Sequence, residues 1–290
     1  MNIFRDPRWG RGHETYGEDP YLTGELGKAY VEGLQGDGEY LKAAACAKHF
    51  AVHSGPEALR HKFDAKATKK DMYETYLPAF EKLVKEAKVE AVMGAYNRTN
   101  GEPCCGSPAL QKILRTDWGF EGHFVSDCWA LRDFHTQHMV TDTAEESAAL
   151  AIKNGCDVNC GNTYLHLLRA LEQGLITEED LTRSAERLFT TRYLLGLFDK
   201  TEYDEIGLDK VECKEHLKLA DEATAKSVVL TAEQEEAEGS RRGRSQCQQP
   251  RGTDWKLSWY LLPVYHCSGG NPGCPWGGCA GILFRGKPSV

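Results

Sequence analysis

The chain has 290 residues, 41% hydrophobic and 27% charged, which is enough to bury a core in one large domain or two smaller ones. Its net charge of −8 lacks the basic stripe of nucleic-acid-binding proteins, so we expect no nucleic-acid partner. No apolar run approaches the roughly 20 residues that cross a bilayer, and the first residues lack a signal-peptide core, so we expect no membrane partner.

The first segment in chain order is a loop-like stretch, DPRWGRGHETYGEDP at residues 6–20, rich in Arg, carboxylates and Gly. It is either a solvated loop with internal ion pairs or a binding loop, since Arg clamps oxygen atoms through two donors. In the segment AAACAKHFAVHSGPE, Lys48 and His49 follow an apolar run of strand type. A basic pair there fits a ligand site at a strand end or, equally, a strand end that reaches solvent.

A helix is predicted over residues 69–88, because its apolar side chains recur at helical spacing. They share one face: Met72, Tyr76, Phe80, Leu83, Val84 and Ala87. A strand of length typical for a buried sheet follows at 90–96, and a loop rich in turn-forming residues comes next. A second helix is expected at 109–118 and a second strand at 123–127.

Two helix starts are marked by capping boxes, in which a Thr and an acidic side chain three residues later satisfy each other's backbone N–H groups. Thr143 with Glu146 precedes one helix that closes near Gly155, and Thr177 with Asp180 precedes another. Alternating strands and helices favour an α/β fold with parallel strands. Periodicity alone fits either a doubly wound sheet or a (β/α)8 barrel.

Two strand ends carry polar side chains that could do chemistry. Tyr96 and Asn97 end the strand at 90–96, where a hydrogen-bonded turn is the simpler explanation. Asp127 ends the next strand and is followed by Trp129. A lone Asp there is usually a turn former or helix cap, but a carboxylate beside an indole also suits a sugar site.

The eleven cysteines do not form a disulfide-scaffold pattern, so we expect reduced thiols, with Cys156 and Cys160 in the core, and a cytosolic chain. His266 with three nearby cysteines lacks the spacing of a zinc site, and no phosphate-cradling motif occurs. No metal and no cofactor are therefore predicted.

Composition changes in the last third of the chain. Residues 200–230 are polar and charged, and we interpret them as a linker toward another domain. Residues 231–290 are rich in Gly, Pro, Cys and Trp without an apolar period, which indicates an irregular, disordered tail.

Four motifs, taken together, resemble glycoside hydrolase family 3. They occur in the family's order: NIFRDPRWGRGHETYGEDP, CAKHF, VMGAYNRTNGEPCCGSP and WGFEGHFVSDCWA. The resemblance runs from residue 2 to about 230 and implies a (β/α)8 barrel followed by a second, α/β sandwich domain. It further implies removal of β-linked glucose, xylose or related sugars from non-reducing ends, with retention and without a cofactor.

The resemblance assigns roles to individual residues. Asp127 matches the catalytic nucleophile, whose charged form neighbouring cations would favour. The residues that match sugar-binding positions, or lie where such a role is possible, are Arg11, Lys48, His49, Tyr96, Trp129 and Glu57. Many relatives have the sequence SDW at the nucleophile, whereas this chain has SDC followed by Trp129. The aromatic residue that the resemblance assigns to stacking on the sugar therefore lies one position later here.

The chain also departs from the family's pattern. Retaining glycosidases need a second carboxyl group about 5–5.5 Å from the nucleophile, and residues 231–290 contain nothing like the domain that carries it. Residues 1–199 are too few for a barrel of about 250 residues, so we expect a truncated barrel and weak or no turnover. The expected substrate is a small β-glucoside or oligosaccharide, with a β-xylosidase or a non-catalytic sugar-binding remnant as alternatives.

Overall fold

The computed structural model describes residues 1–228, in two units that divide between Glu205 and Ile206. The tail predicted at 231–290, which contains His266 and its nearby cysteines, lies outside the described residues. The predicted boundaries at 199 and 230 remain predictions.

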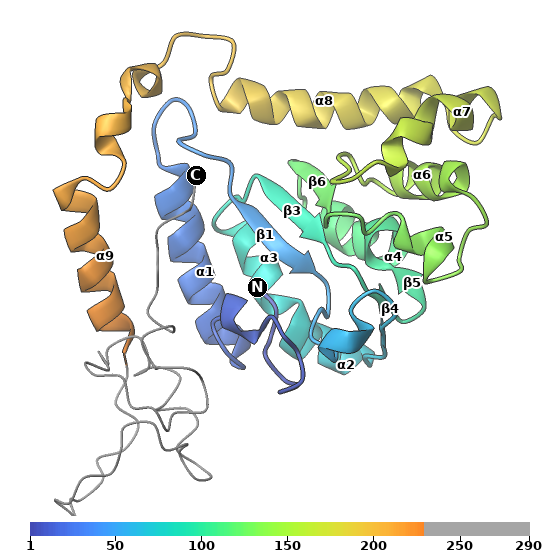
Figure 1. The fold of residues 1–290 in the computed structure, drawn as a ribbon, viewed down its shortest axis with the longest axis horizontal. Coiled ribbons are helices and arrows are strands. Elements are labelled where there is room, and N and C mark those ends of the chain that lie inside the picture. Colours follow the sequence, from blue (N-terminus) through green and yellow to red (C-terminus); the bar gives the residue numbers. More distant parts are fainter. Residues whose placement is uncertain (229–290) are drawn as a thin grey trace, which may run out of the picture. The chain divides into compact units, whose positions relative to one another are not determined.

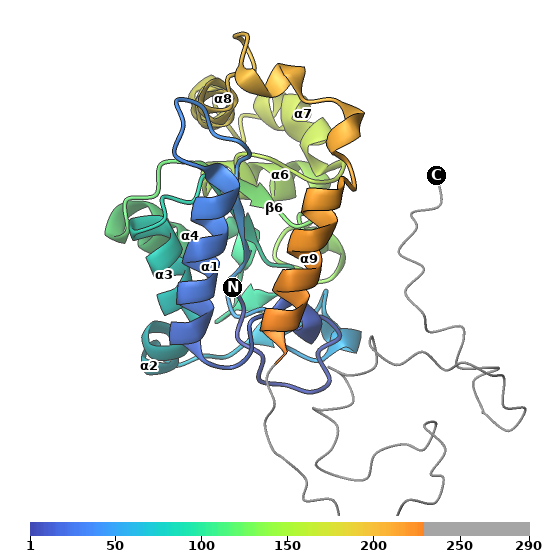
Figure 2. The ribbon, with the colours of Figure 1, turned by 90° about the vertical axis from the view of Figure 1, so that its left-hand side faces the viewer.

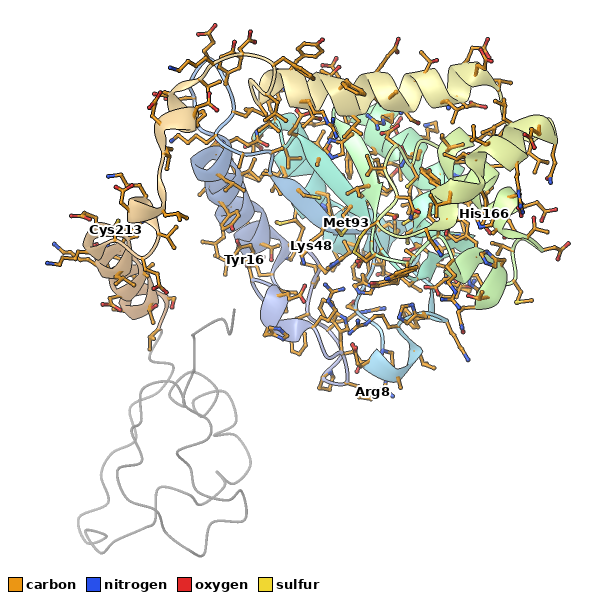
Figure 3. All side chains as sticks on the ribbon, turned by 45° about the horizontal axis from the view of Figure 1, so that its top comes forward. Arg8, Tyr16, Lys48, Met93, His166 and Cys213 are labelled. Carbon is orange, nitrogen blue, oxygen red and sulfur yellow. A yellow bond between two sulfur atoms is a disulfide. The ribbon has the colours of Figure 1, made fainter. Side chains whose placement is uncertain are left out.

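A three-stranded parallel sheet forms the centre of the first unit (Figure 1). Its strands are β1 (Cys46–Phe50), β3 (Ala91–Gly94) and β6 (His123–Ser126), in the order β1-β3-β6. Figure 3 shows Lys48 of β1 beside Met93 of β3, which are register partners. The predicted strands at 90–96 and 123–127 are therefore confirmed. Because all three strands are parallel, their carboxyl ends meet at one edge.

A smaller sheet lies in the connections that follow β1 and β3. It contains β2 (Asp64–Ala65), β4 (Arg98–Thr99) and β5 (Glu102–Pro103), with β4 and β5 antiparallel. The hairpin between them turns at Asn100 and Gly101, whose positive φ angles of 52° and 96° suit the Asn-Gly pair.

The predicted helix at 69–88 is present but is not one regular α-helix. It consists of α2 (Lys69–Asp71), a π-helical stretch at Met72–Tyr76 and α3 (Pro78–Lys85). All six side chains predicted for its apolar face are buried. The helix predicted at 109–118 has the same form, with α4 (Pro108–Gln111) running into π-helical turns at Lys112–Asp117.

Helix α1 (Pro20–Gln35) has no counterpart among the predicted elements. It begins at Asp19, whose carboxylate accepts hydrogen bonds from two backbone N–H groups of the first turn, with Pro20 at the first helical position. Figure 2 shows α1 beside α3 on one side of the sheet. The ring of Phe50 in β1 packs edge to face against Trp118 and against Phe80 of α3, which joins the strand to this helix.

The second half of the unit contains α5 (Asp133–Thr136), α6 (Ala144–Lys153), α7 (Leu167–Glu172) and α8 (Glu178–Leu194). Both predicted capping boxes, at Thr143 and Thr177, are confirmed.

Short 3-10 turns occur throughout the described residues, at Gly12–Glu14, Glu57–Leu59, Cys104–Gly106, Thr163–His166, Glu202–Glu205 and Leu208–Lys210.

The second unit, as far as it is described, contains α9 (Lys214–Ser227), a helix within the stretch predicted as a linker. The α/β class with a parallel sheet agrees with the prediction, but the sheet of residues 1–228 is open and not a closed barrel. None of the described helices is long and apolar enough to span a bilayer.

Candidate active site

Asp127 lies immediately after β6, at the carboxyl edge of the sheet. Its backbone N–H donates to the carbonyl of Gly94, which continues the pairing of β6 with β3 beyond the last strand residue. Its side chain is only 10% exposed, and Oδ1 accepts a hydrogen bond of 2.8 Å from the N–H of Cys128. The sheet therefore fixes this carboxylate and leaves Oδ2 for other partners.

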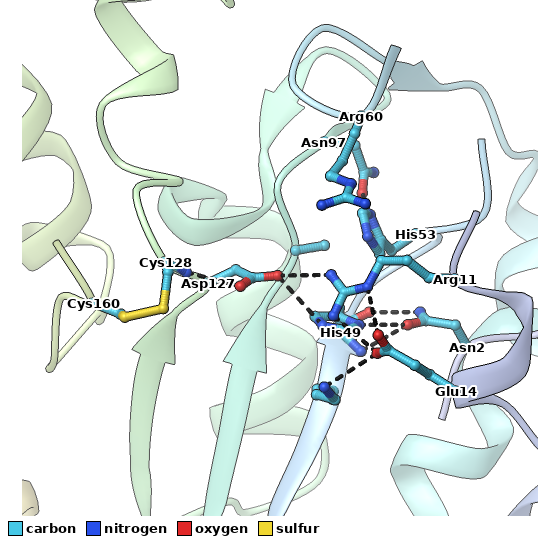
Figure 4. Close-up of polar contacts among 12 residues, drawn as sticks. Asn2, Arg11, Glu14, His49, His53, Arg60, Asn97, Asp127, Cys128 and Cys160 are labelled. Carbon is cyan, nitrogen blue, oxygen red and sulfur yellow. Dashed lines mark hydrogen bonds and ion pairs between the residues drawn. A yellow bond between two sulfur atoms is a disulfide. The ribbon is translucent and has the colours of Figure 1, made fainter. Parts of the chain in front are cut away.

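Two basic side chains approach Oδ2 of Asp127. Nη1 of Arg11 and Nε2 of His49 each lie 3.4 Å from this oxygen (Figure 4). Arg11 comes from the loop before the turn at Gly12–Glu14, and His49 comes from β1. The structure thus brings together three of the residues that the motifs predicted.

Glu14, which was not among the predicted site residues, joins two of the predicted basic residues. Its carboxylate accepts two hydrogen bonds from Arg11, of 3.0 and 2.9 Å, and lies 3.2 Å from Nζ of Lys48. Partial burial opposes ionisation, but these donors lower the pKa of Glu14 to about 2. Lys48 therefore reaches the site through Glu14, and the carboxylate of Glu14 stays charged at neutral pH.

His49 is buried and held by Asn2. The amide oxygen of Asn2 lies 2.8 Å from the backbone nitrogen of His49 and 3.1 Å from its Nδ1. Burial, followed by the positive charges of His53, Arg11 and Lys48, lowers the pKa of His49 below its ordinary value. The imidazole at this position is therefore neutral at neutral pH.

The remaining predicted residues are Tyr96, Trp129 and Glu57, and they differ in their surroundings. Tyr96 is buried, and burial together with the negative charge of Asp127 raises its pKa to about 12. Trp129 is 50% exposed, and its backbone lies in the left-handed region with a φ of 70°. Glu57 instead pairs with Arg60 and accepts a hydrogen bond from the backbone of Gly10.

The prediction of reduced thiols is wrong for one pair of cysteines, because Cys128 and Cys160 form a disulfide. Val125 pairs with Val158 in a parallel bridge, and Trp129 N–H donates to the carbonyl of Cys160, so the two segments run side by side. That long-range pairing brings together cysteines 32 residues apart. Cys156 is a buried free thiol, as predicted, and the cytosolic location stays a prediction.

Asn2 and Glu14 lie in the first motif, at residues 2–20, but nothing in the spacing of that segment marked them as site residues. Asn2 binds His49 and Glu14 binds Lys48, both far away in the chain, and the pairing of Glu14 with the nearby Arg11 does not reveal the link to Lys48. Only the ion-pair-rich composition of residues 6–20 pointed toward Glu14.

A comparison with family models matches residues 1–191 to the glycosyl hydrolase family 3 N terminal domain. A xylan 1,4-beta-xylosidase of Xylanibacter ruminicola is 46% identical over 239 residues, which are 79% of this chain and 28% of the relative. The probable beta-D-xylosidase 7 of Arabidopsis thaliana is 40% identical over 248 residues, or 79% of this chain and 32% of the relative. The chain thus spans about a third of the length of these curated relatives.

Solved structures agree with the sequence relatives. A GH3 exo-beta-xylosidase in complex with a xylobiose aziridine activity based probe matches with a TM-score of 0.74 and 34% identity, covering 78% of this chain and 31% of that one. A beta-glucosidase from Listeria innocua in complex with glucose matches with a TM-score of 0.71 and 32% identity, covering 78% and 32%.

Proposed function

Since the chain belongs to glycosyl hydrolase family 3, we propose that it acts on terminal β-linked sugars of glycosides, with Asp127 as the nucleophile. The observation that carries this proposal is the position of its carboxylate. Oδ2 lies 3.4 Å from Arg11 and from His49 at the carboxyl edge of the sheet, which is where α/β barrels bind substrates.

The proposed reaction proceeds by two displacements with retention. The Asp127 carboxylate attacks the anomeric carbon while the bond to the leaving oxygen breaks, which forms a glycosyl ester on the enzyme. Water then attacks the same carbon, the ester bond to Asp127 breaks and the sugar is released; the proton that water loses balances the proton that the leaving oxygen takes up. Arg11 and Lys48, both bound to Glu14, supply positive charge and hydrogen-bond donors for sugar hydroxyls.

For the sugar, we propose β-xylosides first and β-glucosides as the alternative. The names of the curated relatives support xylose, because those reported above are xylosidases at 40% identity or more. The similarity to beta-glucosidase structures supports glucose, which was the preference drawn from the motif resemblance.

A sugar-binding protein without turnover is the second candidate. Glu14 is the carboxylate that shares Arg11 with Asp127, and its pKa of about 2 makes it a poor proton donor to a leaving group. Titration calorimetry with xylose and glucose, run beside a hydrolysis assay, separates the two candidates. Binding of either sugar without hydrolysis supports the second.

The decisive experiment is covalent trapping with 2-deoxy-2-fluoro-β-xyloside and β-glucoside that carry an activated leaving group. Such a leaving group departs without proton donation, so the assay reports on the nucleophile alone. We expect an intact-mass increase of one glycosyl unit, mapped by peptide analysis to Asp127 and absent in Asp127→Asn. Asp142→Asn, at an exposed loop position, is the control that should still be labelled. Labelling at another residue would contradict the proposal.

A further inference from the structure

The amide of Asn2 has only one orientation that satisfies its neighbours. The backbone N–H of His49 must donate, and it points to Oδ1 of Asn2 at 2.8 Å. The backbone carbonyl of His49 must accept, and it lies 2.7 Å from Nδ2 of Asn2. These two obligatory groups identify which side-chain atom of Asn2 is the oxygen and which is the nitrogen.

That orientation decides where the proton on the His49 ring lies. Nδ1 of His49 is 3.1 Å from the same Asn2 oxygen, which can only accept. Nδ1 must therefore carry the proton, and in a neutral imidazole Nε2 is then an unprotonated acceptor.

The Nε2 atom of His49 is buried and has no hydrogen-bond partner among the described residues. It lies 3.4 Å from Oδ2 of Asp127, which has Arg11 as its donor, so Nε2 of His49 is the acceptor that still calls for a donor. A sugar hydroxyl is such a donor. We propose that Asn2 is a positioning residue that holds His49 as its Nδ1–H tautomer, so that Nε2 accepts a hydrogen bond from a hydroxyl of the bound glycoside.

The same tautomer also matters for the nucleophile. If Nε2 carried the proton, it would donate to Oδ2 of Asp127 and lower the nucleophilicity of that oxygen. With Nε2 bare, the donor near Oδ2 among the described residues is Arg11, at 3.4 Å. Asn2 thus acts on Asp127 through His49 without touching it.

A second pair in the site has the same construction and provides an internal reference. Nδ2 of Asn97 donates to the carbonyl of Arg98 at 2.9 Å, which leaves its oxygen 3.0 Å from Nδ1 of His53. His53 is therefore also held with its proton on Nδ1. The His49 and His53 rings pack 4.9 Å apart, but the proton on His53 is fixed by Asn97, so a change at Asn2 should leave the tautomer of His53 unaltered.

The test is the ¹⁵N spectrum of the histidine rings in the full chain, at pH 7, with assignment by His49→Gln and His53→Gln. We expect wild-type His49 to show a protonated Nδ1 and a bare Nε2. In Asn2→Ala the proton should move to Nε2, where Asp127 accepts it, while Asn2→Asp keeps an acceptor oxygen and should keep Nδ1 protonated. A His53 ring that keeps its proton on Nδ1 shows that the site remains folded.

A wild-type His49 protonated on Nε2 or on both nitrogens overturns the inference, as does an Asn2→Ala ring that keeps its proton on Nδ1. The second measurement is xylose and glucose affinity, which should fall about tenfold in Asn2→Ala. Unchanged affinity with an inverted tautomer overturns the role toward the sugar.

The nature of the ligand rests on the proposed function, but the ring spectrum does not. The expected tautomer in a protein that binds and cleaves no sugar would overturn the proposed function and leave the action of Asn2 on His49 in place. An active protein whose His49 carries its proton on Nε2 would overturn the action of Asn2 on His49 and leave the proposed function in place.

Discussion

Arg11 and Asp127 lie 116 positions apart in the chain, yet Nη1 of Arg11 is 3.4 Å from Oδ2 of Asp127. Nε and Nη2 of the same guanidinium donate two hydrogen bonds to Glu14. A planar fork can serve both carboxylates at once, whereas the single ammonium of Lys cannot. Arg11 therefore couples the loop at residues 6–20 to the end of β6.

Replacing Arg11 by Lys should slow trapping of the fluoroglycoside about tenfold or more, which corresponds to an activation free energy higher by about 1.4 kcal/mol or more. The measurement is the rate of adduct formation by intact mass. Arg8→Lys is the matched control, because Arg8 lies in the same loop but pairs with Asp6 and is 73% exposed. Equal trapping rates for Arg11→Lys and the wild type would show that the fork is not needed.

Removing the Cys128–Cys160 disulfide should destabilise the chain by about 3 to 4 kcal/mol, because it closes a loop of 32 residues. The N–H of Cys128 also binds Oδ1 of Asp127, so trapping should slow as well. We would compare urea unfolding and trapping for the double Cys→Ser variant and the wild type. Peptide mapping without reductant should recover the two cysteines linked, and free thiols at both would refute the pairing.

Asp157→Asn should cost about 3 to 5 kcal/mol of folding free energy. The Asp157 side chain is fully buried and accepts from Arg115 at 2.8 Å, Arg187 at 3.0 Å and the N–H of Phe124 at 2.8 Å. Loss of its charge leaves two guanidinium groups without a counterion between β6 and α8. Urea unfolding measures the effect, and Asp117→Asn, in an exposed pair with Lys112, should change it by less than about 0.5 kcal/mol. Equal values for both variants would contradict the buried network.

Glu14 should make stability depend on pH below 5. Its pKa is lowered from 4.5 to about 2 in the folded state, so its contribution is fully present above pH 4.5. It is lost as the pH falls through about 2, below which the carboxyl group is protonated in both states. Because the ion pairs of Glu14 are partly exposed, we expect this contribution to the free energy of unfolding to be about 1 kcal/mol. The difference in unfolding free energy between wild type and Glu14→Gln should shrink from pH 5 to pH 2.5, and a constant difference would count against the ion pairs.

Local features were predictable from the sequence because they depend on residues three or four positions apart. The capping boxes at Thr143 and Thr177 and the buried face of residues 69–88 are of this kind. The π-helical stretches were not, since they keep the apolar face while shifting its hydrogen bonds by one residue. Helix α1 was missed although Asp19 and Pro20 mark its start.

By itself, the sequence determined the family through four motifs, and it identified Arg11, His49 and Asp127 as residues worth following. The tertiary structure decided what these side chains do to one another. Asn2 against His49, Glu14 between Arg11 and Lys48, and Cys128 bonded to Cys160 are all fixed by how the strands and loops pack. Contacts between distant residues depend on strand register and loop path, and no pattern within a single segment encodes either.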